Sequence, residues 1–129
     1  MNIPSEFDPI RPFNPEELPA VYDRLLADPQ FQQVITTLFP GVSLEDLGKK
    51  MKSCKTNLEF QKAFCYPVLQ DLIHKASFGC SMDASSVNIN HRYTFVSNHR
   101  DIVLDSALLD KLLLDVGFST TCEIAIGDN

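Results

Sequence analysis

Four titratable side chains fall within seven positions, from His99 to Asp105, in the stretch TFVSNHRDIVLDSALLDKLLLD at residues 94–115. A histidine beside a carboxylate can work as a general base, because the carboxylate fixes the imidazole tautomer and stabilises the imidazolium ion. Either Asp101 or Asp105 can reach one ring nitrogen of His99, which leaves the other nitrogen to accept a proton from a bound hydroxyl. This pattern is typical of acyl-transfer chemistry.

The same residues also fit a purely structural role. Asp101 is a natural N-cap for the helix that follows it, and Asp105 lies one turn further on the same helix face. In this interpretation His99 is only exposed to solvent and Asp105 only complements the helix dipole. The helix is apolar on most faces, however, so we expect it to be buried. A carboxylate in a buried helix needs a partner, which favours the interpretation as a base and its orienting group.

Three predicted elements position this cluster. Residues 93–97 (YTFVS) are β-branched and aromatic, which predicts a short buried strand. Residues 102–117 predict a helix that ends at Gly117, a residue suited to the αL conformation. Residues 120–127 (TTCEIAIG) predict a second strand. A strand, a helix and a strand over this length are typical of the β-α-β unit of a parallel sheet, whose ligands bind beyond the carboxyl ends of the strands.

The preceding part of the chain predicts four or five amphipathic helices. Asn14 and Asp28 are each followed by a proline, and an N-cap residue followed by proline is a common pattern at the start of a helix. Ser43 begins a pattern that resembles a capping box. A longer helical segment over residues 57–77 contains Pro67, which we expect to kink or split the helix.

The composition excludes several classes of protein. The chain has 129 residues, 44% of them hydrophobic and 22% charged, and a net charge of −6 at pH 7, as in an ordinary globular protein. The negative charge argues against nucleic-acid binding. The N-terminus lacks the apolar core of a signal peptide, and no apolar run is long enough to span a bilayer, so we expect a cytoplasmic protein. The four cysteines lack metal-ligand spacing and predict buried free thiols.

The segment FVSNHRDIVLDSALL, residues 95–109, resembles the first conserved block of the glycerolipid acyltransferases, which acylate glycerol 3-phosphate and lysophosphatidate. In that block a strand leads into an Asn-His or related pair, a short spacer, an aspartate and an apolar helix. The pair of His99 and Arg100 looks like the glycerol-3-phosphate branch, and Asn98 with His99 looks like the lysophosphatidate branch. The longer run through EIAIGDN resembles bacterial members that carry a helical N-terminal region.

The sequence departs from the family pattern in two ways. The family places its aspartate after a spacer of four residues, which corresponds to Leu104, whereas the aspartate here is Asp105. A one-residue shift rotates a helical side chain by about 100°, so the role falls to Asp105 with a shifted helix start, or to Asp101. The later family blocks, which hold the acceptor phosphate, do not occur in this sequence. The resemblance therefore implies the N-terminal part of a larger enzyme, inactive or very weak by itself.

The resemblance implies transfer of a fatty acyl group from coenzyme A or acyl carrier protein to a lysophospholipid or a glycerol-phosphate-like acceptor. His99 is the implied general base and Asp105 its orienting residue. Arg100 is then a contact for phosphate or for the thioester carrier, or else forms a surface ion pair. Asn98 positions substrate or forms a turn. Since the thioester is a substrate, neither a metal nor a bound cofactor is expected, and the implied location includes peripheral contact with the cytoplasmic membrane.

The predicted fold class is therefore α/β. A helical N-terminal region covers residues 1–84, and the first β-α-β unit of an acyltransferase-type sheet covers residues 85–129. Two rival functions stay open at this point. One is a non-enzymatic helical interaction module, and the other is a hydrolase that uses the same His-Asp pair on thioesters or esters.

Overall fold

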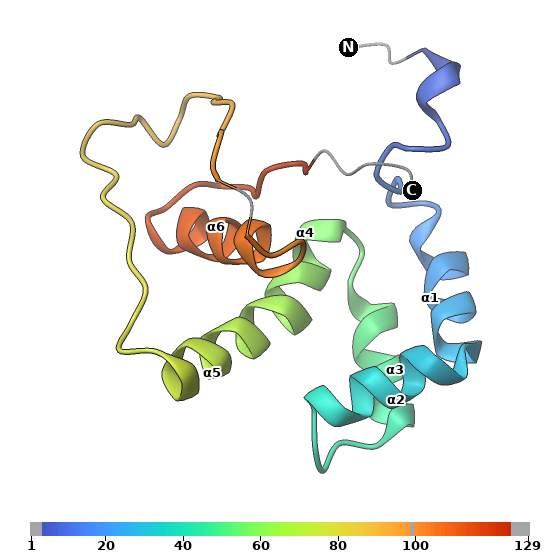
Figure 1. Ribbon diagram of the computed structural model, residues 1–129. Helices are drawn as coiled ribbons and strands as arrows, with labels where there is room; N and C mark the ends of the chain where they lie inside the picture. Colours follow the sequence, from blue (N-terminus) through green and yellow to red (C-terminus); the bar gives the residue numbers. More distant parts are fainter. Residues whose placement is uncertain (1–3, 99, 125–129) are drawn as a thin grey trace. The chain divides into compact units, whose positions relative to one another are not determined.

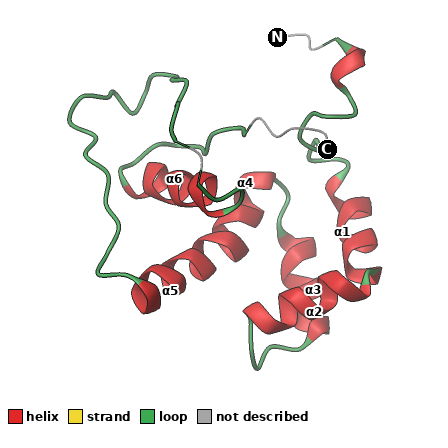
Figure 2. Cartoon of the chain, in the orientation of Figure 1, coloured by secondary structure: helices red, strands yellow, loops and turns green. Residues whose placement is uncertain are grey.

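The computed structural model describes residues 4–98 and 100–124, and the regular secondary structure in this part of the chain is helical (Figures 1 and 2). The chain divides into two compact units, residues 1–60 (unit 1) and residues 61–129 (unit 2). The domain boundary predicted near residue 84 falls within unit 2 and stays a prediction. None of the described helices has the length and apolar character needed to cross a bilayer.

Unit 1 consists of short helices packed around a small core. A single 3-10 turn, η1 (Ser5–Phe7), precedes α1 (Leu18–Ala27), α2 (Pro29–Leu38), α3 (Leu44–Ser53) and α4 (Asn57–Phe60). The helices α1, α2 and α3 contact one another pairwise. The side chains buried in this unit are those of Leu18, Tyr22, Ile35, Leu47, Met51 and Cys54.

Two of the predicted helix starts in unit 1 are confirmed. The Asp28 carboxylate accepts hydrogen bonds from the amides of Gln30 (2.7 Å) and Phe31 (3.0 Å) at the start of α2. The Ser43 hydroxyl oxygen accepts one from the amide of Asp46 (3.1 Å) at the start of α3. These bonds satisfy amides that have no partner within the helix.

The start predicted at Asn14 is wrong, because α1 begins only at Leu18. Pro19 has no amide hydrogen to donate to the carbonyl of Pro15, so this carbonyl instead accepts from the amide of Leu18 at 3.3 Å, in a tighter turn. Asn14 still takes part in the turn, since its own amide donates to the Glu17 carboxylate at 2.7 Å.

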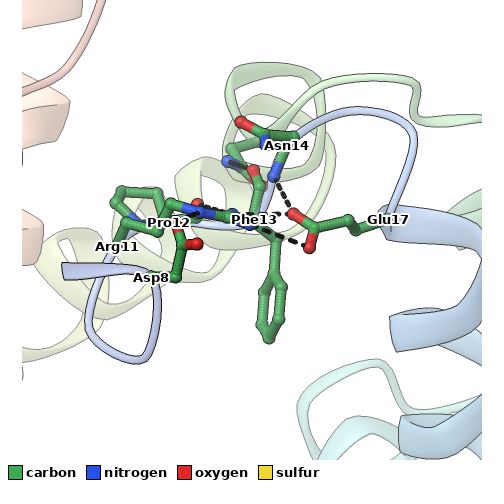
Figure 3. A network of polar contacts seen from close by, with 7 residues as sticks. Asp8, Arg11, Pro12, Phe13, Asn14 and Glu17 are labelled. Carbon is green, nitrogen blue, oxygen red and sulfur yellow. Dashed lines mark hydrogen bonds and ion pairs between the residues drawn. The ribbon is translucent and has the colours of Figure 1, made fainter. Parts of the chain in front are cut away.

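An arginine-centred network holds the segment before α1 (Figure 3). The Arg11 guanidinium donates to both carboxylate oxygens of Glu17, at 2.8 and 3.1 Å, and its Nε donates to Asp8 at 3.1 Å. From α4, the Asn57 side-chain amide donates to the carbonyl of Phe13 at 2.8 Å. The bidentate geometry is the most specific that Arg and a carboxylate can form, so it fixes residues 8–17 at the start of α1.

Unit 2 begins with a helix that changes its hydrogen-bond pattern at a proline. A single π-helical turn, η2 (Gln61–Cys65), leads directly into α5 (Tyr66–Ala76). Pro67 has no amide hydrogen, and in an unbroken α-helix its ring would collide with the carbonyl of Ala63. A wider π turn accommodates both constraints. The disturbance predicted at Pro67 is therefore a change of helix geometry, with no break between η2 and α5.

The last helix, α6 (Leu104–Asp115), ends in a Schellman motif. The amide of Gly117 donates to the carbonyl of Leu114 at 3.2 Å, and the amide of Phe118 donates to that of Leu113 at 3.0 Å. Gly117 has a φ of +103°, a conformation that is strained for any residue with a Cβ atom. The predicted helix end is confirmed.

A partly buried ion pair within α6 is linked to α5 by a tyrosine. Lys111 is only 6% exposed and pairs with Asp115 one turn along α6. The Tyr66 hydroxyl donates to the same carboxylate at 2.5 Å, and the Lys111 ammonium lies 5.0 Å from the centre of the Tyr66 ring. The bond to Asp115 raises the pKa of Lys111. Burial opposes ionisation of Asp115, but the bonds from Lys111 and Tyr66 lower its pKa, so the pair stays charged at neutral pH.

The predicted α/β fold class is wrong for the described part of the chain, which contains no strand (Figure 2). Residues 93–97 and 120–124 form no ladder, and residues 125–127 of the second predicted strand lie outside the described residues. The β-α-β unit expected over residues 85–129 is therefore absent from the described part of this range. Two short parallel strands without further neighbours would leave most of their backbone groups unpaired.

Aromatic packing takes the place of strand pairing around residue 95. The rings of Tyr93 and Phe95 lie 6.4 and 6.5 Å from the ring of Phe118, both edge-on. The side chain of Val96 is exposed to solvent, whereas side chains on both faces of a strand in a parallel sheet are covered. The β-branched and aromatic residues of this segment therefore take part in apolar packing and do not pair with a neighbouring strand.

A buried hydroxyl provides a test of the unit 1 core. Tyr22 is 3% exposed, and its hydroxyl has no hydrogen-bond partner among the described residues. We expect Tyr22→Phe to leave the free energy of unfolding unchanged or to raise it by up to about 1 kcal/mol, because no bond is lost. Tyr66→Phe, which removes a bond to a carboxylate, should lower it by about 1 kcal/mol. Urea unfolding followed by circular dichroism measures both, and a clear loss in Tyr22→Phe would contradict the described packing.

The Arg11 network predicts an acid transition. Bonds from Arg11 and from the Asn14 amide lower the pKa of Glu17 from 4.5 to about 2. A lowered pKa means that the stabilisation is complete above pH 4.5 and is lost as the pH falls from 4.5 towards 2. An NMR titration should therefore show the Asn14 amide shift moving over this range. Arg11→Ala should move the midpoint upward, and Glu17→Gln should abolish the transition.

Candidate functional site

The site residues predicted from the sequence gather at the start of α6. Asn98, Arg100 and Asp101 precede the helix, and Asp105 lies in its first turn. His99, the predicted base, lies outside the described residues. The part of the site that the structure describes is the backbone and the carboxylates that follow His99 in the chain.

Asp101 caps the turn that precedes this helix. Its Oδ1 atom accepts hydrogen bonds from the amides of Val103 at 2.9 Å and Leu104 at 2.7 Å. The regular helix starts only at Leu104, so Asp101 closes an Asx-type turn that leads into it. The N-cap position of α6 itself is Val103, which makes no side-chain cap bond. Asp101 therefore caps the turn before α6 and not the helix as predicted, and these bonds occupy one oxygen of its carboxylate.

Asp105 reaches back over the same turn. Its Oδ2 atom accepts hydrogen bonds from the amides of Arg100 at 2.6 Å and Asp101 at 2.9 Å. Asp101 thus accepts from amides that follow it in the chain, and Asp105 accepts from amides that precede it, as the two side chains of a capping box do. The bond to Arg100 places a carboxylate against the peptide group that joins this residue to His99.

This arrangement holds a negative charge in a fixed place. Two amide donors restrict the rotation of the Asp105 carboxylate, and charge-assisted bonds of this kind are about twice as strong as neutral ones. The start of a helix also carries partial positive charge, which stabilises the ionised form. A carboxylate fixed in this way presents the same orientation to any further hydrogen-bond donor that reaches it.

The two predicted substrate contacts are solvent-exposed. The side chains of Asn98 and Arg100 make no hydrogen bond or ion pair with any residue in the described ranges. The surface ion pair considered for Arg100, for instance with Asp101, is thus not formed there. Its guanidinium group can meet an anionic ligand without first breaking an internal bond.

A second polar cluster in unit 2 was not predicted from the sequence. The thiol of Cys122 donates to the Asp110 carboxylate at 3.0 Å, and the amide of Cys122 donates to the same oxygen at 2.9 Å. Burial, together with the bond to Asp110, raises the pKa of this thiol to about 11. Burial and then Asp110 also raise the pKa of Cys65. Thiols that stay protonated at neutral pH are poor nucleophiles.

The cysteines are free, as predicted, but only partly buried. Cys54 is buried and Cys122 is half-buried, whereas Cys65 and Cys80 are exposed. Within residues 4–98 and 100–124, no group of three or more His, Cys, Asp or Glu side chains is placed to hold a metal ion.

Comparisons of this chain with protein-family models, with curated proteins and with solved structures found no match.

The two carboxylates of this site give a stability prediction. Asp101→Ala removes a cap and should lower the free energy of unfolding by about 1 kcal/mol, whereas Asp101→Asn should cost much less, because Asn also caps well. Asp105→Ala leaves two amides without their acceptor and should cost about 1–2 kcal/mol.

Urea unfolding measures these changes, with Asp71→Ala as the control. Asp71 belongs to an exposed ion pair with Lys75 on α5, and such pairs contribute about 0.3–0.5 kcal/mol. If Asp105→Ala costs no more than this control, its carboxylate does not hold the turn.

Proposed function

We propose that this chain carries the catalytic base of an acyltransferase, an enzyme that moves a fatty acyl group from an acyl thioester to a hydroxyl of a lipid. The acceptor is a glycerophospholipid precursor or a similar molecule. The observation that carries the proposal is the Asp105 carboxylate, fixed by two backbone amides immediately after His99 in the chain. The likeness of residues 95–109 to the first acyltransferase block supports it.

The proposed reaction is a single displacement at the thioester carbonyl. His99 takes the proton of the acceptor hydroxyl while the hydroxyl oxygen attacks the carbonyl carbon. The carbon–sulfur bond then breaks, the ester forms, and the departing thiolate takes the proton from the imidazolium ring. Asp105 orients the imidazole and stabilises its charged form. Asp101 is the alternative orienting residue, although two amides already occupy one of its oxygens.

The other elements of the proposal follow from the chemistry of the substrates. The donor is acyl-coenzyme A or an acyl carrier protein, and the acceptor is a lysophospholipid or a glycerol-phosphate-like molecule. The exposed Arg100 suits a phosphate on either substrate, since its planar guanidinium group can donate two parallel hydrogen bonds. Asn98 is proposed to position the substrate. The proposed location is the cytoplasm, with peripheral contact at the inner face of the membrane.

One observation favours a second candidate, a non-enzymatic helical interaction module. Val34 and Leu38 are exposed one turn apart on α2, and Val42 is exposed in the loop that follows. An apolar row of this kind on a short helix can dock on a partner protein. In this case the residues around His99 form only a turn, and a substitution at His99 leaves every affinity unchanged.

The deciding variant is His99→Ala, made in the protein as its own cells produce it. With palmitoyl-coenzyme A and a panel of lysophospholipids, we expect the rate of thiol release to fall about 10²–10⁴-fold, the usual contribution of a positioned base. A thiol-reactive dye measures the release, and mass spectrometry identifies the ester. His91→Ala alters an exposed histidine outside the site and should keep the full rate.

Two results would overturn the proposal. Release of thiol that depends on His99 but needs no lipid acceptor would identify a hydrolase that uses water with the same His-Asp pair. Absence of any His99-dependent release across the panel would remove the base assignment and leave the interaction module as the better account.

A further inference from the structure

Three aromatic side chains of unit 2 form a cluster that stays partly open to solvent. The ring centres of Tyr93, Phe95 and Phe118, the aromatic trio, are 6.2, 6.4 and 6.5 Å apart. The planes of Tyr93 and Phe95 are inclined by 53°, and each is inclined by 75° to the plane of Phe118. Tyr93 is 40% and Phe95 36% exposed, and Phe118 is half-buried, so solvent reaches part of the aromatic surface.

Two of these rings are held in place by hydrogen bonds. The amide of Asn88 donates to the Tyr93 hydroxyl oxygen at 2.8 Å, which fixes the outer end of this ring. The backbone of Phe118 belongs to the Schellman motif, where its amide donates to the carbonyl of Leu113 at 3.0 Å. A group of rings that is already ordered costs less conformational entropy when it binds a ligand.

The trio differs from other aromatic rings of this chain in having no cation over it. Arg24, Lys50 and Lys111 each lie over a ring elsewhere, with the charged group between 5.0 and 5.9 Å from the ring centre. Over the trio, no arginine or lysine from residues 4–98 or 100–124 takes this position, although Arg92 directly precedes Tyr93 in the chain. The electron-rich faces of this cluster are thus not neutralised from within the described chain.

We propose that the aromatic trio binds a quaternary ammonium group, as found in choline and in the choline headgroup of lipids. The three ring centres are almost equally spaced, so a cation centred above them lies within about 6 Å of all three, the range in which aromatic rings attract a cation. The net charge of −6 also favours a cationic ligand. This inference does not depend on the proposed acyl transfer.

The surroundings of the rings favour a quaternary ammonium over an amine or a guanidinium group. In the described ranges, the only hydrogen bond to a side chain of the trio is the one from Asn88 to Tyr93. An ammonium or guanidinium ion that leaves water needs acceptors for its N–H groups, and aromatic rings do not replace them. A quaternary ammonium has no N–H group, and its methyl groups gain from contact with apolar surface.

The test compares choline with an uncharged molecule of the same shape. In the full chain at constant ionic strength, choline should shift the NMR signals of the three rings in a saturable way. It should bind about 10-fold more tightly than 3,3-dimethylbutan-1-ol, in which carbon replaces the charged nitrogen. Glycerophosphocholine, the lipid headgroup without acyl chains, distinguishes the two sources of the ligand, because tighter binding than choline assigns the site to a lipid headgroup and weaker binding assigns it to free choline.

Substitution of one ring locates the site. Phe95→Leu keeps an apolar side chain but removes one aromatic face, and it should weaken choline binding about 2- to 5-fold, the usual contribution of one exposed ring. The matched control is Phe78→Leu, which alters a fully exposed phenylalanine outside the trio and should keep the wild-type affinity. Circular dichroism checks the fold of both variants, and the comparison of ligands on the unmodified chain needs no variant.

Three results would overturn the inference. In the unmodified chain, choline leaves the ring signals of the trio unchanged, or the uncharged analogue binds as tightly as choline. In the variants, a folded Phe95→Leu protein binds choline as well as the Phe78→Leu control does.

Discussion

The amides at the start of each helix are the constraint that organises this chain. They have no partner within the helix, and helices of about ten residues are marginal unless these groups are satisfied and one face is buried. Side-chain oxygens of Asp28, Ser43 and Asp101 supply the missing acceptors. The candidate site depends on the same kind of bond. Asp105, proposed to orient the base, accepts from the amides of Arg100 and Asp101 just before the helix, while Asp101 caps the turn that leads into it.

Local chemistry explains which parts of the fold could be predicted from the sequence. The caps at Asp28 and Ser43, the change of helix geometry before Pro67 and the glycine end at Gly117 depend on a few neighbouring residues, and the structure confirms them. The start of α1 was missed because it depends on the amide hydrogen that Pro19 lacks. The sheet was wrongly predicted because a strand needs a neighbouring backbone, and the composition of residues 93–97 does not report whether one is present.

The candidate site could be predicted in part, for the same reason. The spacing from His99 to Asp105 located the cluster, and the position of Asp101 before the helix predicted a capping role, which it has in the turn before α6. The bonds from Asp105 to the amides of Arg100 and Asp101 depend on how the turn closes, which spacing alone does not decide. The pair of Lys111 and Asp115 has a visible spacing of four residues, but its bond to Tyr66, which is distant in the sequence, could not be predicted from that spacing.

The long connection between α5 and α6 has a consequence for how the two units fold. Residues 77–103 contain no regular helix or strand in their described part, yet Tyr93 and Phe95 must meet Phe118 beyond α6. Closing such a loop costs conformational entropy that grows with its length, by about 0.6 kcal/mol for each doubling. In unit 1 the residues between distant partners such as Tyr22 and Phe60 are mostly helical and already ordered. Unit 1 can therefore assemble from local contacts, while unit 2 has to order a free segment before its aromatic cluster contributes.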